Sequence, residues 1–248
     1  MKFGKKYVKN YIGSLYQPYK NYNIMNIYME KHLLHPKHPK FEPNKWNKKY
    51  IKHSHNCYAY AMNTISKKYV KTCKRFSKMK KKEKTRKIRR IKKKTRNIWD
   101  NWDFENKKND ICPYIRPQIG VESNMIYKYK TTKDINKKKI EKMLLKDNSG
   151  IKKVKRGEKI PYGYYKIFLY GWKNRKKGKG DYHFIRQDNT GQWSHKDGIT
   201  IAKKLKEKTP DDYMKKFKNK NKNIKYSICG YYAVPIKGKK NLGSLYFL

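Results

Sequence analysis

The second half of the chain carries the pattern that most limits the fold, an antiparallel hairpin. Residues of strand type run from Tyr164 to Tyr170 and from Tyr182 to Gln187, and a turn at 188–191 sends the chain back through 192–196. Residues 173–180 are typical of a basic turn, and 226–235 of a final strand. This half therefore predicts a sheet.

Apolar residues upstream have helical spacing instead. They recur every three or four positions from Ala59 through Cys73 to Phe76, which predicts one helix from Asn56 to about Met79 with a single buried face. Residues 134–147 predict a second, short amphipathic helix that 148–150 closes. A helix followed by an antiparallel sheet indicates an α+β fold.

One segment is strongly basic. Between Lys67 and Asn97 there are eighteen Lys or Arg and a single acid, Glu83. We interpret about 67–97 as a basic helical insertion in a domain of 46–248, preceded by a Tyr- and Lys-rich arm at 1–45. Such a charge run is often only a solvated surface, but it is the best local candidate for phosphate binding. The candidate nucleic-acid-binding residues are Lys80, Lys81, Lys82, Lys84, Arg86, Lys87, Arg89, Arg90, Lys92, Lys93 and Lys94.

The whole chain has a formal net charge of +49, from 67 Lys and Arg against 18 Asp and Glu. This charge predicts at least weak binding to a polyanion such as DNA or RNA at low salt. AT-rich codons, which favour Lys, Asn, Ile and Tyr, would produce the same excess without a selected partner. Although only 36% of the residues are hydrophobic, 15% are aromatic, which indicates a folded core rather than disorder.

Targeting signals and cysteine spacing limit the compartment. No apolar run has the length of a secretion signal or a membrane span, so we expect an intracellular protein without a membrane partner. The four cysteines form no Cys-x-x-Cys pair, which argues against a zinc knuckle. In a reducing compartment Cys57, Cys73, Cys112 and Cys229 are expected to be free thiols, the last three as core residues.

Cys57 stands at the predicted start of the first helix. A thiol attacks carbonyl carbon as a thiolate, and a helix N-terminus or a neighbouring imidazole lowers the pKa of the thiol. His183 and His195 lie on the two strands of the predicted hairpin, so strand pairing would bring the second imidazole near the first. The spacing predicts a relay of Cys57, His183 and His195.

Other interpretations of the same residues stay open. The cysteine and the two histidines could be ordinary buried residues, and Asp181, Gln187 or Asp188 could orient His183 in place of His195. Metal binding is the other alternative. One candidate site is the His-x-His-x-Cys string of His53, His55 and Cys57 together with His183, and the other is His32, His35 and His38, where Pro36 and Pro39 interrupt any helix.

Five sequence blocks carry a resemblance to a known family. NCYAYA, RPQIG, PYGYYKIFLY, DYHFIRQDNTGQWSHKDG and ICGYYAVP resemble the pattern NCYAYAL, KPQPG, GYYKIALV, DYHFYRQDxxGxWSHKPG and CGYF of an uncharacterised family of bacteria and large DNA viruses. The motif at Cys57 and the step from His183 to His195 are also similar to the NlpC and CHAP groups of papain-like cysteine peptidases and amidases. Ile119 stands where the family has Pro, and the gap between Cys57 and His183 is longer than is usual in the NlpC group.

The resemblance implies a papain-like α+β fold in which the helix of Cys57 packs on an antiparallel sheet. It also implies a hydrolase of an amide or isopeptide bond, with a peptide or protein substrate, Cys57 as nucleophile, His183 as general base and His195 as the orienting group. No metal or cofactor is predicted. The residues expected to bind around the relay are Asn56, Tyr58, Asp181, Gln187 and Trp193, of which Trp193 also fits simple packing.

The alternative function is structural. On this interpretation the same fold is a non-catalytic, strongly basic protein that associates with nucleic acid or forms part of a virion. For either function the expected location is the cytoplasm or a viral factory, with packaging into the virion as an extension.

Overall fold

The computed structural model describes residues 38–99, 110–112, 114–128, 136–176, 180–220 and 223–247. Most of the arm predicted at 1–45 lies outside these residues. Residues 39–45 belong to the compact unit Pro39–Leu248. The carbonyl of Lys40 accepts a hydrogen bond from Arg186 at 3.0 Å, and the carbonyl of Pro39 accepts one from the backbone of Asn189 at 2.8 Å. These bonds hold Pro39 and Lys40 against residues 186–189.

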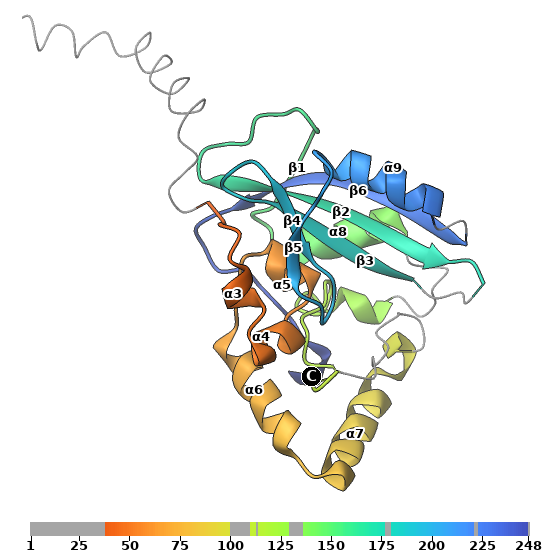
Figure 1. Cartoon of the computed structure of the whole chain (residues 1–248). Coiled ribbons are helices and arrows are strands. Elements are labelled where there is room, and N and C mark those ends of the chain that lie inside the picture. The colour runs from red at the N-terminus through yellow and green to blue at the C-terminus, as the bar shows by residue number, and fades with distance from the viewer. Residues whose placement is uncertain are drawn as a thin grey trace, which may run out of the picture. The chain divides into compact units, whose positions relative to one another are not determined.

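Six antiparallel strands form one sheet in the order β1-β6-β2-β3-β4-β5 (Figure 1). The α+β prediction is confirmed, and the predicted hairpin is β3 and β4. Strand β2 continues past Tyr170 to Asn174 and pairs with β3 as far as Gly180, so the predicted basic turn is shorter than expected. The strands are β1 Lys152–Val154, β2 Tyr164–Asn174, β3 Gly180–Gln187, β4 Trp193–Lys196, β5 Ala202–Lys204 and β6 Ile224–Pro235.

Helices cover both faces of the sheet because each long strand is apolar on both sides. On one face Ile167 and Phe184 pack against α5 (Cys57–Ala61) and α8 (Lys137–Asp147). On the other face Phe168 and Ile185 pack against Met214 of α9 (Pro210–Lys220). Figure 1 shows α9 and α8 on opposite sides of the strands. The sheet is therefore the central layer, and the site lies where its residues meet α5.

The single helix predicted from Asn56 to Met79 is wrong. Helix α5 ends at Ala61, and α6 (Lys67–Lys78) starts anew with Ser66 as its N-cap. Between them Asn63 has a left-handed φ of 49°, and its side-chain oxygen accepts a hydrogen bond from Arg186 at 2.9 Å. The buried Arg186 guanidinium also bonds to the carbonyl of Tyr60 at 3.1 Å. Arg186 thus favours termination of α5 by binding both its last turn and the residue that breaks the helix.

Helices α6 and α7 (Lys81–Trp99) form the basic segment predicted at 67–97. They pack around Cys73 and Phe76 together with the C-terminal turn η3 (Leu245–Phe247), and Figure 1 shows η3 between the two helices. The expectation that all four cysteines are free thiols is wrong for two of them, because Cys73 and Cys112 are joined in a disulfide. Cys57 and Cys229 are free and buried.

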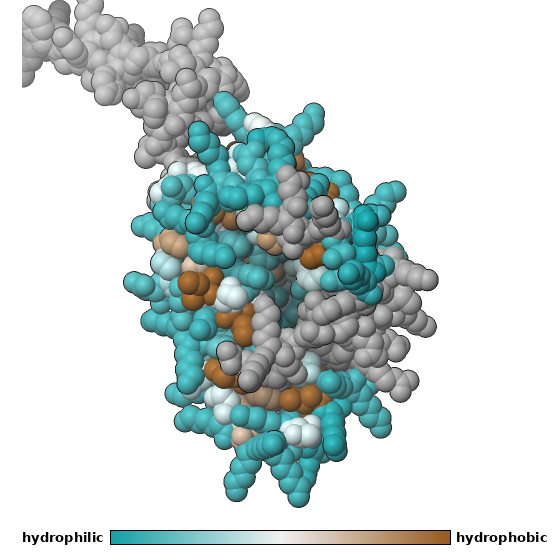
Figure 2. Space-filling model, turned by 45° about the vertical axis from the view of Figure 1, so that its right-hand side comes forward, coloured by the Kyte–Doolittle hydropathy of each residue, from teal (hydrophilic) through white to brown (hydrophobic). Residues whose placement is uncertain are grey.

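Three short helices complete the described residues. Helices α3 (Pro43–Trp46) and α4 (Lys49–Ser54) precede α5, and the turn η1 (Met125–Lys128) precedes α8. Figure 2 shows a surface that is mostly hydrophilic, with hydrophobic residues in small separate areas. Among the described residues, no helix combines the length and apolar character needed to cross a membrane.

Candidate active site

The N-cap of α5 positions Cys57. The Asn56 side-chain oxygen accepts a hydrogen bond from the backbone N–H of Ala59 at 3.3 Å, and its amide nitrogen donates to the carbonyl of Pro117 at 2.8 Å. The first contact starts the helix and the second fixes it to the 114–128 segment. Cys57 therefore lies in the first turn of a helix, as predicted, although that helix is only five residues long.

The thiol of Cys57 lies at an unpaired edge of β3. Its Sγ contacts the carbonyl oxygen of Tyr182 at 3.9 Å, and the backbone of Phe184 also hydrogen-bonds to the sulfur. Strand β4 pairs with β3 from Ile185 to Gln187, so among the described residues no strand lies beside the backbone at 182–184 on this side. Cys57 occupies the position that a neighbouring strand would take. His183 stands between Tyr182 and Phe184, the two residues whose backbone contacts the Cys57 sulfur.

His183 and His195 are joined by a hydrogen bond, with Nε2 of His183 and Nδ1 of His195 2.8 Å apart. The strand register explains the contact. His195 pairs with Ile185, and side chains two residues apart on one strand share a face, so both imidazoles lie on the α9 face of the sheet. The predicted approach of the two imidazoles across the hairpin is confirmed.

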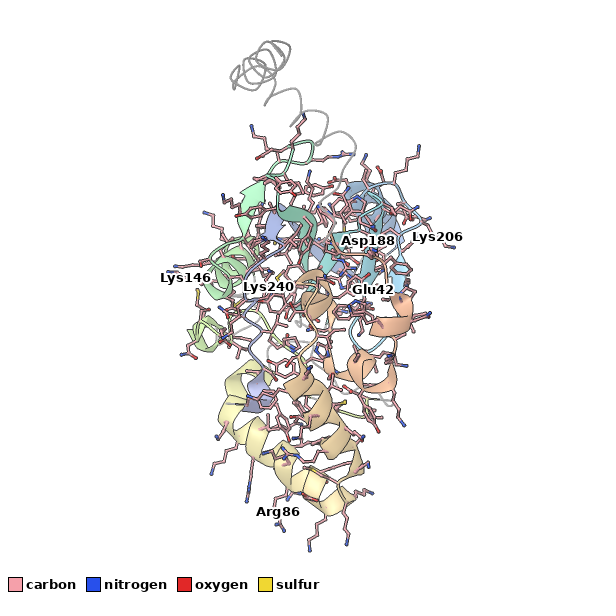
Figure 3. The ribbon with its side chains drawn as sticks, turned by 90° about the vertical axis from the view of Figure 1, so that its left-hand side faces the viewer. Glu42, Arg86, Lys146, Asp188, Lys206 and Lys240 are labelled. Atoms are coloured by element: carbon pink, nitrogen blue, oxygen red, sulfur yellow. A yellow bond between two sulfur atoms is a disulfide. The ribbon has the colours of Figure 1, made fainter. Side chains whose placement is uncertain are left out.

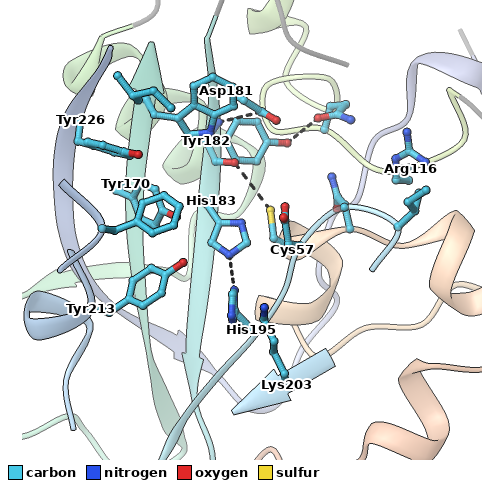
Figure 4. Close-up of a pocket in the computed structure, with 18 of the residues that line it drawn as sticks. Cys57, Arg116, Tyr170, Asp181, Tyr182, His183, His195, Lys203, Tyr213 and Tyr226 are labelled. Carbon is cyan, nitrogen blue, oxygen red and sulfur yellow. Dashed lines mark hydrogen bonds between the residues drawn. The ribbon is translucent and has the colours of Figure 1, made fainter. Parts of the chain in front are cut away.

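Cys57, His183 and His195 line one cavity of about 470 Å³. Figure 4 shows the His183 ring between the Cys57 side chain and His195, with the Cys57 sulfur directed at the backbone of Tyr182. The thiol approaches from the α5 face, the imidazole pair lies on the α9 face, and both border the cavity at the edge of β3. The structure thus brings the three residues of the predicted relay together.

Burial determines the protonation of this group. It raises the pKa of the Cys57 thiol, the charge of Asp181 raises it further, and the hydrogen bond from Phe184 only partly opposes them. Burial lowers the pKa of His183, and burial with the adjacent His183 lowers the pKa of His195 to about 3. At neutral pH the resting group is a thiol beside two neutral imidazoles. Desolvation outweighs the effect of the helix start on the pKa of Cys57, because a helix of five residues contributes little against it.

The alternative partners for His183 have other contacts. Gln187 donates to the carbonyl of Gly191 at 3.0 Å, which closes the hairpin turn. Asp188 accepts a hydrogen bond from the buried guanidinium of Arg186 at 2.9 Å. Asp181 does line the cavity, and its carboxylate accepts the backbone N–H of Tyr182 at 2.8 Å. The hydrogen-bonded partner that the structure gives the His183 ring is His195.

Two of the five predicted binding residues, Asn56 and Asp181, line the cavity. The other three do not, and each has a structural role. Gln187 caps the hairpin, as described above. The Tyr58 hydroxyl donates to the carbonyl of Asn241 at 3.0 Å beneath α5. Trp193 packs with Ile185 and Met214 in the core under α9, which favours the packing interpretation over substrate stacking.

Several cavity residues were not predicted. Gln118, from the RPQIG block, accepts a hydrogen bond from the Tyr182 hydroxyl on Oε1 at 2.6 Å. Arg116 forms an ion pair with Asp110 at 2.6 Å. Aromatic residues form the wall on the side of β2, β6 and α9. The sequence shows that these segments are rich in aromatic residues, but only the folded structure shows that their rings face the site. The wall comprises Tyr170, Trp172, Tyr213, Phe217 and Tyr226.

Lys196, next to His195, is fully buried. Its ammonium group donates to the carbonyls of Lys52 at 2.8 Å and His55 at 2.5 Å, and also to that of Gly198. Burial, with a smaller effect of the Arg116 charge, lowers the pKa of Lys196 to about 7. Lys196 connects β4 to the residues that lead into Asn56 and Cys57.

The two histidines of the His-x-His-x-Cys string contact other groups. The ring of His55 contacts the Ser54 hydroxyl at 2.8 Å and accepts the backbone N–H of Ser66 at 2.9 Å. His53 lies 3.7 Å from a carboxylate oxygen of Asp110. In the part of the chain that the structure describes, no group of three or more His, Cys, Asp or Glu is placed to hold a metal ion. His32 and His35 lie outside that part.

The candidate nucleic-acid-binding residues lie on and just before α7, and nine of the eleven have exposed side chains. The other two are partly buried: Lys84 donates to the carbonyl of Ser77 at 2.8 Å, and Lys87 lies 5.1 Å from the centre of the Tyr246 ring. Figure 3 shows Arg86 at the far end of the α6–α7 pair, pointing away from the body. The segment thus presents a projecting basic surface.

Comparison of the chain with protein-family models, with curated proteins and with solved structures gives no match.

Proposed function

We propose that this protein is a papain-like cysteine hydrolase that cleaves an amide or isopeptide bond. Cys57 is the nucleophile, His183 the general base and His195 the group that orients His183. The observation that carries the proposal is the hydrogen-bonded imidazole pair at the cavity that the Cys57 thiol also lines. A thiol from a helix start and an imidazole from a strand are the arrangement on which papain-like enzymes rely.

The resting protonation indicates how attack would begin. We assign the proton of this hydrogen bond to Nε2 of His183, so that His195 accepts on Nδ1 and Nδ1 of His183 is left unprotonated for the thiol. As the sulfur attacks the carbonyl carbon of the substrate, the thiol proton passes to His183, so no free thiolate has to exist in the buried site. A neutral imidazole is the competent base here, and burial keeps His183 neutral.

The remaining steps balance without a cofactor. The tetrahedral intermediate collapses, the C–N bond breaks, and His183 gives its proton to the leaving amine, which leaves an acyl thioester on Cys57. Water then attacks the thioester, its proton passes to His183, and the sulfur takes that proton back as the carboxylic acid leaves. The backbone N–H of Cys57 and the side-chain amide of Gln118 are the proposed donors to the oxyanion, because Tyr182 binds Oε1 of Gln118 and leaves its NH₂ for the cavity.

Alkylation by iodoacetamide at pH 7 tests the role of the thiol, and Cys229 is an internal control. Both cysteines are free and buried, and burial raises the pKa of both thiols. We expect Cys57 to react at least about tenfold faster than Cys229, because Cys57 lines the cavity of the proposed base His183 and Cys229 does not. The His183→Ala variant should remove that advantage. Equal rates for the two cysteines, unchanged by His183→Ala, would reject the proposal.

The second candidate function is binding of nucleic acid through α7. The exposed basic side chains along this projecting helix favour it (Figure 3). Replacing Lys80, Lys81, Lys82, Arg86, Arg89 and Arg90 with Gln should reduce the slope of log K against log salt by about 0.9 for each phosphate that the variant no longer neutralises. The control replaces six exposed lysines on other elements. If both variants change the slope equally, the binding is a property of the total charge and not of α7.

A further inference from the structure

A row of three side chains lies beside His183 on the same face of the sheet. Trp172 of β2 pairs with Tyr226 of β6 on one side and with Asp181 of β3 on the other. Tyr170 and His183 form the next row on this face, and they also pair directly. Positions two residues apart on a strand share a face, so the row Tyr226–Trp172–Asp181 is adjacent to the row of the proposed base.

The spacing of these rows corresponds to the spacing of side chains in a bound peptide. Two residues along a strand span about 7 Å, so the Trp172 row lies about that far from His183. An extended peptide whose scissile carbonyl lies at Cys57 and His183 would place a neighbouring side chain at the row. The row therefore has the position of a specificity subsite.

Aromatic residues form the wall of this subsite. The ring of Phe217 on α9 packs edge-on against Tyr226, with ring centres 5.7 Å apart. The hydroxyl of Tyr226 is buried and has no hydrogen-bond partner among the described residues. Figure 4 shows this hydroxyl pointing inward, toward the central strands of the site. Flat rings beside a carboxylate form a surface that suits the long stem and cationic head of a basic side chain.

Among the described residues, the cavity is richer in acids than the chain as a whole. Its lining includes the acids Asp110, Asp181 and Asp197 against the bases Arg116 and Lys203, whereas the whole chain has 67 basic and 18 acidic residues. Arg116 is paired with Asp110, and Lys203 lies at the other end, in register with His195. Asp181 brings a carboxylate to the end of the cavity at Trp172.

We propose that Trp172 and Asp181, with Tyr226 behind them, form a subsite for a lysine or arginine side chain next to the bond that is cleaved. The stem of the side chain packs on the indole ring, and its positive head lies against the carboxylate of Asp181. The inference rests on the proposed function, because it treats the cavity as a substrate site. It adds the class of substrate: a peptide or protein with a basic residue beside the scissile bond.

Binding to a protein that cannot cleave tests the subsite separately from catalysis. The Cys57→Ala variant of the full chain is titrated with N-acetyl-Ala-Lys-Ala-amide and with the norleucine peptide of the same length, at about 0.15 M salt, by NMR. This salt screens charges more than about 8 Å away, so the distant positive surface contributes little. We expect the lysine peptide to bind about tenfold more tightly, as a partly desolvated cation on an aromatic ring with a nearby carboxylate implies.

Matched variants assign the effect to Asp181. Asp181→Asn, which retains the oxygen that accepts the Tyr182 N–H, should reduce the lysine preference to less than about twofold. Glu207→Gln removes the same charge outside the cavity and should leave the preference unchanged. Equal binding of both peptides, no measurable binding of either, or a preference that survives Asp181→Asn overturns the subsite. Cleavage by the chain with Cys57 intact is measured in parallel, so lysine-selective binding without cleavage refutes the hydrolase and not the basic subsite.

Discussion

Lys196 joins β4 to the segment before Cys57, and its replacement should destabilise the fold measurably. Its ammonium group is fully buried and donates to the carbonyls of Lys52, His55 and Gly198. Lys196→Met keeps most of the volume of the side chain and removes all three donors. The three carbonyls then lie in the protein interior without the partner that satisfies them.

The size of the effect follows from two opposed contributions. Each hydrogen bond from a charged donor is worth about 1.5–3 kcal/mol. The Met variant has no ammonium group to take out of water on folding, and this saving offsets several kcal/mol of the loss. The net loss of unfolding free energy should therefore be about 2–4 kcal/mol, which a domain with about 5–15 kcal/mol of stability survives in the folded state.

Urea unfolding followed by tryptophan fluorescence measures this loss. Lys208→Met is the matched control, because Lys208 is exposed and such a change should stay within about 0.5 kcal/mol of the unmodified chain. The m value should not change, since the same surface is exposed on unfolding. If Lys196→Met and Lys208→Met unfold at the same urea concentration, the three carbonyl contacts do not contribute as argued.

The difference in stability between the unmodified chain and Lys196→Met should also change with pH in a defined direction. Burial lowers the pKa of Lys196 in the folded chain to about 7, from 10.5 when it is exposed. Between these values the unfolded chain holds a proton that the folded chain lacks, so the stability from Lys196 rises with pH by at most about 1.4 kcal/mol per unit. The deficit of Lys196→Met should be larger at pH 9 than at pH 6.5. A deficit that shrinks over this range contradicts the assigned cause.

Three further predictions concern the site and the fold. His195→Ala should lower kcat/KM by the order of 100-fold, at the low end of what assisted proton transfer contributes, while the affinity for a bound peptide changes little; an unaffected kcat/KM would show that His195 does not orient His183. Because burial lowers the pKa of His183, the acidic limb of the kcat/KM profile should lie below pH 6.5, the ordinary imidazole value, and a limb above it would mean that His183 is not the base in its buried state. The Cys73–Cys112 disulfide closes a loop with a sequence separation of 39, so its reduction should lower the unfolding free energy by about 2–4 kcal/mol, and an unchanged urea midpoint in reductant would contradict that.

Local features of the site could be predicted from the sequence. The turn at 188–191 fixes the register of β3 and β4, and the register brings His195 to His183. Asn56 is an N-cap residue type, which places Cys57 in the first turn of a helix. These contacts depend on short stretches of chain, so spacing was sufficient to find them.

Features that depend on distant segments could not be predicted. The helix from Asn56 was predicted to be too long because its break depends on Arg186, which contacts Asn63 from another part of the chain. Arg186 and Lys196 are charged residues that sequence patterns place on the surface, yet both are buried with oxygen partners. The meeting of Cys57 with the edge of β3 depends on where β4 stops pairing, which spacing along the chain does not show.

The most direct test of the central claim is detection of an acyl-enzyme on Cys57. The protein is incubated with a peptide thioester that carries a basic side chain, quenched in acid, and mapped by mass spectrometry, with neutral hydroxylamine used to distinguish thioesters from amides on lysine. Our account predicts a hydroxylamine-sensitive acyl group on Cys57 that forms and then disappears, and that forms much more slowly in His183→Ala. Acylation that spares Cys57, or proceeds equally in His183→Ala, would contradict it.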